Sequence, residues 1–389
     1  MQDSPSLLLL EAAGQLAVSR FEVMRGIAQA ASALIPQGPI VVAAFDARGA
    51  LDPGTVQFER ADLRQVLRFH DWQRSASPEI RRLLLGLTPG VLTVHADTTP
   101  GPLADYLAGA RRLSTLCVMA NTGNGGGIHL LAGCTDVQDW SAARIDHLRD
   151  VARHLAAAWR IREALEPVEP PEPLSEAEVP TTARDVLRRM VVGADPATAR
   201  ANGIALWPAL VAGRWSLLDA FTAAGARHIV AYRNPDGVAP LRALLPREQF
   251  VVEFALGGQS GKWIAIELDL SESAVARTLR TALRKLGVAD DAALAGIQGA
   301  AFARFDGLGA APGGSGIDLA VARLTPAERS LAPLSQAERD IVADILTGKR
   351  VTAIAYERGT SPRTVAHQIA SVYRKLGASS RRELLALLT

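Results

Sequence analysis

The apolar residues in the first part of the chain follow two patterns, short runs and a helical periodicity. Short apolar runs that are rich in Val, Ile and Leu predict β-strands at 39–47, 91–97, 114–121 and 128–134. Helical periodicity flanks these runs at 6–34 and at 140–165. The pattern therefore predicts a sheet that is framed by a first and a last helical region.

The last of these helical regions carries an apolar stripe with alternating steps of three and four residues. Its members are Ile145, Leu148, Ala152, Leu155, Trp159 and, at the end, Arg162. Such a stripe either packs into the core of its own domain or forms the seam of a dimer. The spacing alone leaves both interpretations open.

Two changes in composition divide the rest of the chain. Segment 166–182 holds five Glu, several Pro and no basic residue, which predicts a stiff, solvated Pro/Glu linker. Segment 306–316 is rich in Gly and predicts a flexible linker over 299–333. Between the two linkers, 183–243 predicts a small helix and a hairpin at 214–234.

The remaining segments form an internal repeat with an offset of 90 residues. Segment 244–298 aligns with 334–388 without gaps, and both contain the tetrapeptide RKLG. Other matches in this register are Glu248 with Glu338, Ser271 with Ser361, and Val275 with Val365. So many matches in one register indicate two copies of one fold.

The second copy contains the start and stop signals of four short helices. Ser335 and Glu338 form a capping box, and Ser361 caps a helix that has Pro362 in its first turn. That helix is expected to end at Gly377, after an Arg and a Lys that suit the helix dipole. A short helix near 351–358, a tight turn and this longer helix predict a helix-turn-helix.

Both copies resemble the LuxR-type, four-helix DNA-binding domain. The resemblance rests on LSQAERDIVADILTG, AIAYERGTSPRTVAHQIASVYRKLG and SSRREL in the second copy, and on PREQFVVEFALGG and KWIAIELDLSESAVARTLRTALRKLG in the first. It implies that the third helix enters the major groove of double-stranded DNA. Ala276 and Ala366 stand where members often carry Lys, so one expected DNA contact is missing and site preference cannot be carried over.

The strand and helix pattern over 6–165 resembles a GAF-type sensor domain, which implies small-molecule binding or a role in dimerisation. The expected fold is therefore an α+β multidomain chain. It comprises a GAF-like α/β sandwich at 1–165, with an antiparallel sheet and flanking helices, and two all-α LuxR-type helix-turn-helix domains at 244–298 and 334–389.

Charge separates the two copies. Segment 334–389 has nine basic and five acidic residues, a net charge of +4, whereas 244–298 has six basic and seven acidic residues, a net charge of −1. Because neutralising phosphates supplies much of the affinity for DNA, the second copy is the stronger candidate for DNA binding. The first copy either binds DNA more weakly or serves as a dimerisation or docking module.

The resemblance and the basic positions give candidate DNA contacts, each of which is otherwise a solvated surface residue. On the recognition helix 361–376 the outward side chains are expected to be Arg363, Thr364, His367, Gln368 and Ser371. Arg363 suits guanine, Gln368 suits adenine, and Thr364 suits a phosphate or a thymine methyl. The phosphate candidates are Lys349, Arg350, Arg374 and Arg381. A second DNA site in the first copy would use Lys262, Ser273, Arg277, Thr278 and Arg280.

No other motif predicts chemistry. The Gly-rich segment 122–128 lacks the Lys of a phosphate-binding loop and is expected to be a hairpin turn. Cys117 and Cys134 flank this turn, where they are expected to be buried strand residues that face each other, with a redox switch as the alternative. No nucleophile motif or metal-ligand spacing occurs, so we expect no catalysis, no metal and no cofactor.

The composition is that of an ordinary globular protein, with 48% hydrophobic and 21% charged residues and a net charge of +2. No apolar run approaches the roughly 18 residues that a membrane span needs. The chain is therefore expected to be cytoplasmic and away from membranes. We predict a homodimeric DNA-binding transcriptional regulator that a small molecule or protein controls through the N-terminal domain. The alternative is a scaffold whose helix-turn-helix units bind protein.

Overall fold

The computed structural model describes part of the 389-residue chain. The described residues are 5–35, 38–46, 50–75, 90–95, 114–123, 126–134, 140–165, 182–194, 200–204, 206–224, 226–256, 259–288, 294, 297, 302–308, 317–324, 331, 334–346, 349, 351–376, 378 and 384. The chain divides into two compact units. One comprises Met1–Leu187, Asn234–Leu241 and Gly309–Ile317, and the other comprises Arg188–Arg233, Arg242–Leu308 and Asp318–Thr389. The predicted Pro/Glu linker lies almost entirely outside the described residues.

The first unit contains a five-stranded sheet with the order β2-β1-β5-β4-β3. Its strands are antiparallel and comprise β1 (Ile40–Phe45), β2 (Gln57–Glu59), β3 (Gly90–His95), β4 (Ser114–Asn121) and β5 (Gly127–Cys134). The four strands that the apolar runs predict are confirmed. The pattern missed β2 because this strand has only three residues and none of them is buried.

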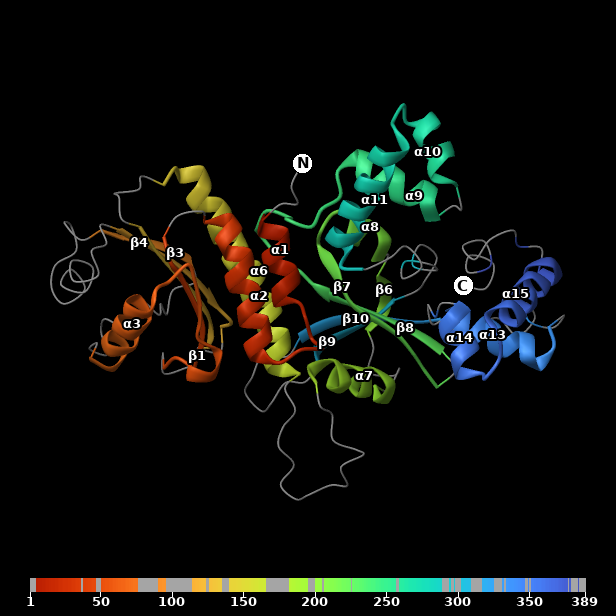
Figure 1. The fold of residues 1–389 in the computed structure, drawn as a ribbon, viewed down its shortest axis with the longest axis horizontal. Helices are drawn as coiled ribbons and strands as arrows, with labels where there is room; N and C mark the ends of the chain where they lie inside the picture. The colour runs from red at the N-terminus through yellow and green to blue at the C-terminus, as the bar shows by residue number, and fades with distance from the viewer. Residues whose placement is uncertain are drawn as a thin grey trace, which may run out of the picture. The chain divides into compact units, whose positions relative to one another are not determined.

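Helices cover this sheet on both sides. Helices α1 (Pro5–Ala13), α2 (Arg20–Leu34) and α6 (Ala142–Ala164) pack together on one face, and Figure 1 shows α3 (Leu63–Ser75) on the other side. A short 3-10 helix, η1 (Pro53–Thr55), precedes β2. The predicted helical region 6–34 is divided in two because Ser19 and Glu22 form a capping box that starts α2.

The apolar stripe of α6 lies in the core of its own unit. Leu148, Leu155 and Trp159 are each at most 1% exposed, and they share a cluster with β-strand residues. Arg162, at the end of the stripe, is also buried and donates hydrogen bonds to the backbone carbonyls of Gln15 and Val18. The core interpretation is confirmed, and the dimer-seam interpretation of this stripe is wrong.

The two cysteines do not face each other across the β4–β5 hairpin. The register pairs Cys117 with Leu131 and Cys134 with Ser114, so this expectation was wrong. Cys117 is fully buried, and burial raises the pKa of its thiol to about 12. The thiol therefore stays protonated at neutral pH, which favours a packing role over redox chemistry.

The second unit contains another five-stranded sheet, with the order β6-β9-β10-β8-β7. Its strands are β6 (Arg200–Ile204), β7 (Trp215–Ala223), β8 (Ala226–Arg233), β9 (Phe302–Leu308) and β10 (Ile317–Leu324). Helices α7 (Ala183–Gly193) and α8 (Leu206–Val211) precede β6 and β7 in turn. The hairpin predicted at 214–234 is confirmed as β7–β8. The linker predicted over 299–333 is wrong, because that segment contains β9 and β10.

The helices of the first copy lie in the chain between β8 and β9. They are α9 (Pro246–Leu256), α10 (Gly261–Glu267) and α11 (Glu272–Leu286). Leu283 and Leu286 of α11 share a hydrophobic cluster with Leu217 and Ile229 of the sheet. The first copy is thus an insertion between two strands of one sheet and packs against that sheet through the end of α11.

Gly287 ends α11 with a left-handed backbone, at φ 82°. A Cβ atom at this position would lie 2.7 Å from the backbone oxygen of Leu217 in β7. The predicted glycine stop is confirmed for the first copy. Its second role, which is to let α11 approach the sheet, was not visible in the sequence.

The C-terminal helices repeat those of the first copy. They are α13 (Gln336–Leu346), α14 (Val351–Glu357) and α15 (Pro362–Leu376), and each begins and ends 90 residues after its counterpart. Ile341, Ile354, Val365 and Val372 form the centre of their core. Most of both predicted fourth helices lies outside the described residues, although Leu294 and Leu384 are buried at matching positions.

Candidate nucleic-acid interface

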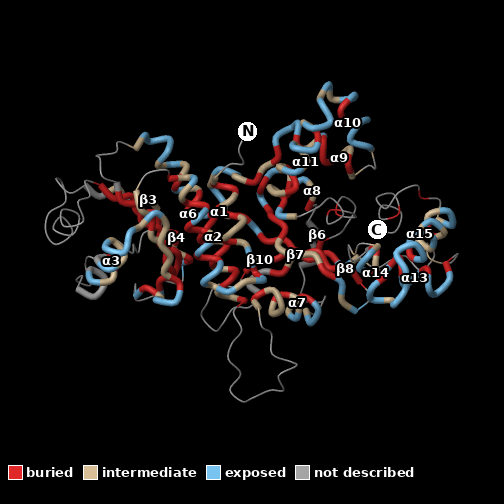
Figure 2. Tube along the Cα trace, in the orientation of Figure 1, coloured by how far each residue is buried: buried red, intermediate tan, exposed pale blue. Residues whose placement is uncertain are grey.

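Helix α15 is built to present one side to solvent. The Ser361 hydroxyl caps it by accepting a hydrogen bond from the Thr364 backbone N–H at 3.1 Å. Val365 and Val372, seven residues apart, are fully buried against α13 and α14. Figure 2 shows exposed and half-buried residues along the rest of the helix. This is the geometry that a recognition helix needs.

The outward side of α15 carries most of the predicted base-reading residues. Arg363, Thr364 and His367 are exposed, and Gln368 is half-buried. Arg363 and His367 are one helical turn apart and therefore lie on the same side. Arg374 follows His367 by two turns and is also exposed. The structure thus brings these side chains to one side of the helix.

Ser371 does not share this orientation. Its hydroxyl donates a hydrogen bond to Oε1 of Glu338 in α13 at 2.8 Å. The side chain is therefore turned toward α13, at the helix–helix contact, instead of outward.

Glu338 is a buried carboxylate that ties α15 to the start of α13. It accepts hydrogen bonds from the Ser335 backbone N–H at 2.8 Å, from Ser371, and from Lys375 Nζ at 2.6 Å. The Lys375 ammonium, followed by the Ser335 and Ser371 donors, lowers the pKa of the Glu338 carboxyl to about 2.

The first copy uses the same lock. Glu248 accepts hydrogen bonds from the Leu245 backbone N–H at 2.7 Å and from Lys285 Nζ at 2.6 Å. The Lys of RKLG therefore pairs, in both copies, with the Glu in the first turn of the first helix. From the sequence, this Lys was expected only to suit the helix dipole. The signal that could have revealed the pair was that both of its members recur at the same offset.

We expect Glu338→Gln to change how the stability of the C-terminal helices depends on pH. Because the pKa of Glu338 is lower in the folded state, the ionised carboxylate stabilises the fold above the ordinary Glu pKa of 4.5. This stabilisation is lost as pH falls toward about 2. The variant should be less stable at pH 7 and should lack this acid-dependent loss. Thermal unfolding across pH 2–7 measures this pH dependence of stability.

Ser371→Ala is the control, because it removes one donor and keeps the ionisable carboxyl. An unchanged pH profile in Glu338→Gln would refute the assignment.

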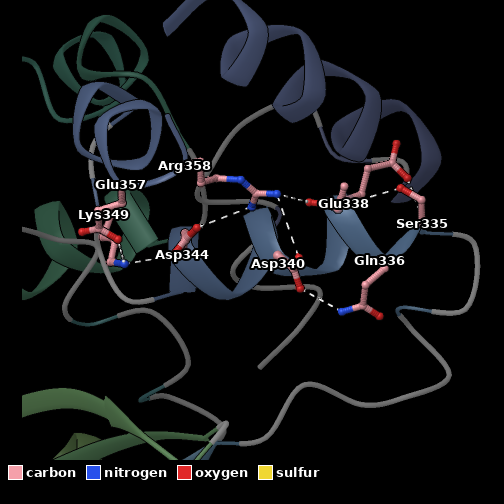
Figure 3. A network of polar contacts seen from close by, with 9 residues as sticks. Ser335, Gln336, Glu338, Asp340, Asp344, Lys349, Glu357 and Arg358 are labelled. Atoms are coloured by element: carbon pink, nitrogen blue, oxygen red, sulfur yellow. Dashed lines mark hydrogen bonds and ion pairs between the residues drawn. The ribbon is translucent and has the colours of Figure 1, made fainter. Parts of the chain in front are cut away.

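Figure 3 shows a group of paired charges on the surface of α13 and α14, called here the ionic cluster. Lys349 donates to Asp344 at 3.0 Å and also to Glu357. Arg358 lies 3.7 Å from Asp344 and 3.9 Å from Asp340. The carboxylates of Glu357 and Asp344 raise the pKa of the Lys349 ammonium. Lys349, a predicted phosphate contact, thus pairs with carboxylates of its own domain. Arg358, which was not among the predicted contacts, belongs to the same cluster.

A family model identifies the segment that carries these helices. Residues 332–388 match the model of the bacterial regulatory proteins of the luxR family. These residues form a luxR-family helix-turn-helix domain. The luxR-type domain so defined contains α13, α14 and α15 and every described DNA candidate of the second copy. Arg350 and Arg381 fall within it but lie outside the described residues.

The candidate second site outside the luxR-type domain is also on the surface. Lys262, Ser273, Arg277 and Arg280 are exposed and Thr278 is half-buried. All except Lys262 belong to α11, the counterpart of α15. The Ser273 hydroxyl lies 3.0 Å from that of the capping Ser271.

Several solved structures are similar to parts of the chain. A phycoerythrobilin-bound GAF domain from a cyanobacterial phytochrome has 12% identity and a TM-score of 0.33, and the match covers 41% of this chain and 96% of that domain. The N-acylhomoserine lactone dependent LuxR family transcription factor CepR2 from Burkholderia cenocepacia has 18% identity and a TM-score of 0.29. The match covers 40% of this chain and 93% of CepR2. SdiA from Escherichia coli has 11% identity and a TM-score of 0.25, and the match covers 73% of this chain and 91% of SdiA. The comparison with curated proteins gave no match.

Within the ranges given above, no group of three or more His, Cys, Asp or Glu side chains is arranged to hold a metal ion. No helix among those residues is both long and apolar enough to cross a membrane.

Proposed function

We propose that the chain is a transcriptional regulator that binds double-stranded DNA by placing α15 in the major groove. The match of residues 332–388 to the luxR family carries this proposal, and the exposed side of α15 supports it. A positively charged helix face with protruding polar side chains suits both the phosphates and the base edges.

Within this proposal the described side chains take different roles. The Arg363 guanidinium reads guanine through two hydrogen bonds, and the Gln368 amide reads adenine. His367 lies beside them on the same side of α15, and Thr364 contacts a phosphate or a thymine methyl. Arg374, in the last turn, contacts a phosphate. Arg350 and Arg381, which lie outside the described residues, stay predicted phosphate contacts. Because Ala366 has no polar group, specificity rests on fewer contacts.

The salt dependence of binding tests the proposal. In a gel-shift titration of the full chain against genomic fragments, each neutralised phosphate should make the slope of log K against log salt more negative by about 0.9. We expect a steep slope together with a preference for a few fragments. Binding that ignores both salt and sequence would overturn the DNA-binding function.

We further propose that the N-terminal unit is a GAF-like domain that controls DNA binding through a small molecule. The face of its sheet away from α2 and α6 carries two buried polar atoms for which the described residues provide no hydrogen-bond partner, Thr115 Oγ1 and His129 Nε2. Met119 is paired with His129 across β4 and β5, so these two side chains lie on the same face of the sheet. Thr115 lies four residues before Met119 on β4 and therefore points to that face as well. Unpartnered buried polar atoms are costly unless something binds them.

The ligand should be a neutral molecule with one or two hydrogen-bonding groups. Burial lowers the pKa of His129 to about 3, so its imidazole is neutral at pH 7 and does not attract an anion. We expect native mass spectrometry of the purified chain to find a retained small molecule, and His129→Leu to lose it. Ile27→Val is the control, because Ile27 is an apolar residue of the cluster on the other face. Absence of any retained molecule, or equal retention in all three proteins, would contradict the ligand site.

A further inference from the structure

The first copy exposes a continuous apolar surface along α9 and α10. Phe250 is 51% exposed, Trp263 is 40% exposed and Ile266 is 74% exposed. Phe250 and Phe254 are one turn apart on α9, and Trp263 and Ile266 are one turn apart on α10. The rings of Phe254 and Trp263 join the two helices edge to face, with centroids 5.2 Å apart. These four residues are called here the α9–α10 stripe.

The luxR-type domain has acidic residues at two of the four stripe positions. At the offset of 90, Phe250 corresponds to Asp340 and Phe254 to Asp344, whereas Trp263 corresponds to Ala353 and Ile266 to Tyr356. Asp340 and Asp344 belong to the ionic cluster. The same three helices therefore form with either set of residues, so the fold does not require an apolar stripe at this surface. A contiguous exposed apolar patch of this kind typically marks an interaction site.

The charges around the stripe indicate what it binds. Arg247 and Lys262 are exposed on its border, and so are Glu267 and Asp269. Two positive and two negative charges leave the border without net charge, so neither nucleic acid nor a strongly charged protein is favoured there. In a two-fold pair with the two α10 helices antiparallel, Lys262 of one copy can face Glu267 of the other, so that residue i meets residue j and j meets i.

We propose that the α9–α10 stripe is a self-association surface that pairs two copies of this chain. The apolar centre supplies the buried area, and the mixed border fixes the orientation of the pair. The pairing involves none of the DNA candidates of the luxR-type domain, so it stands or falls independently of DNA binding. A two-fold pair carries two luxR-type domains, which suits DNA sites made of two half-sites.

The molar mass of the full chain in solution tests the proposal. We expect the wild-type chain to be a dimer by light scattering after size exclusion. Ile266→Asp should weaken self-association by at least about 30-fold, because it places a carboxylate in the apolar centre. Tyr356→Asp is the matched control, since Tyr356 is the counterpart of Ile266 in the luxR-type domain and is 89% exposed. This control should stay dimeric, and circular dichroism should show both variants folded.

Exchanging the border charges identifies the second copy as the occupant. Lys262→Glu and Glu267→Lys should each weaken self-association, and mixing the two proteins should restore a dimer that contains one of each. A monomeric wild type would overturn the proposal. So would a dimer that survives Ile266→Asp, an equal loss in the Tyr356→Asp control, or a mixture that fails to pair.

Discussion

Replacing Arg363 and Gln368 together with alanine is expected to abolish the sequence preference of DNA binding while sparing most of the nonspecific affinity. Each bidentate contact to a base edge contributes about 1–3 kcal/mol of discrimination. The double variant should therefore bind its preferred site at least about 100-fold more weakly, and close to its affinity for unrelated DNA. Both side chains lie on solvent-facing positions of α15, outside the buried stripe of Val365 and Val372. Folding should be unaffected.

A matched pair of changes on the first copy provides the control. Arg277 and Arg280 are exposed on α11, which is the counterpart of α15. Replacing both with alanine should leave the preferred site unchanged if the luxR-type domain alone reads sequence. A loss of preference in this control would instead place sequence readout on the first copy. A preference that survives the Arg363→Ala and Gln368→Ala changes would show that another face contacts the bases.

Gly287→Ala is expected to destabilise the second unit by about 3 kcal/mol. A left-handed backbone conformation costs a residue with a Cβ atom roughly 1–2 kcal/mol. Overpacking adds about 1–3 kcal/mol, because the new Cβ would lie 2.7 Å from the backbone oxygen of Leu217, which is fixed in β7. The effect should appear as a lower denaturation midpoint of the unit, followed by tryptophan fluorescence from residues such as Trp215.

Two other glycines separate the causes of this effect. Gly261, in α10 of the same copy, would place a Cβ in open space, so Gly261→Ala should be neutral or slightly stabilising. Gly359 has a φ of 59° but also open space around it, so Gly359→Ala should show only the backbone cost. If Gly287→Ala were no worse than Gly359→Ala, α11 would not be pressed against the sheet as described.

Local signals in the sequence predicted local structure well. The helix bounds around Ser335, Ser361 and Gly287 follow from caps and stops that act within one turn. The 90-residue repeat predicted that the helices of the two copies would correspond, and their bounds do. The buried stripe of α6 likewise follows from its spacing alone.

Pairing over long sequence distances was not predictable in the same way. β10 pairs with β8, although the first copy separates the two strands in the sequence. No local feature of the Gly-rich region predicts this pairing. Ser371 lies at the edge of the outward side of α15, and only the buried Glu338 across the helix contact decides where its hydroxyl points. Lys349 was likewise predicted as a phosphate contact from its charge, and its pairing with Asp344 and Glu357 could not be predicted from the sequence.

A binding-site selection shows whether the chain reads DNA sequence through the luxR-type domain. The full wild-type chain would be equilibrated with random double-stranded DNA at moderate salt, and the retained fragments would be sequenced over successive rounds. We expect enrichment of one motif that contains a guanine and an adenine spaced for Arg363 and Gln368 on one side of α15. Retained DNA with no enriched motif after several rounds would contradict it.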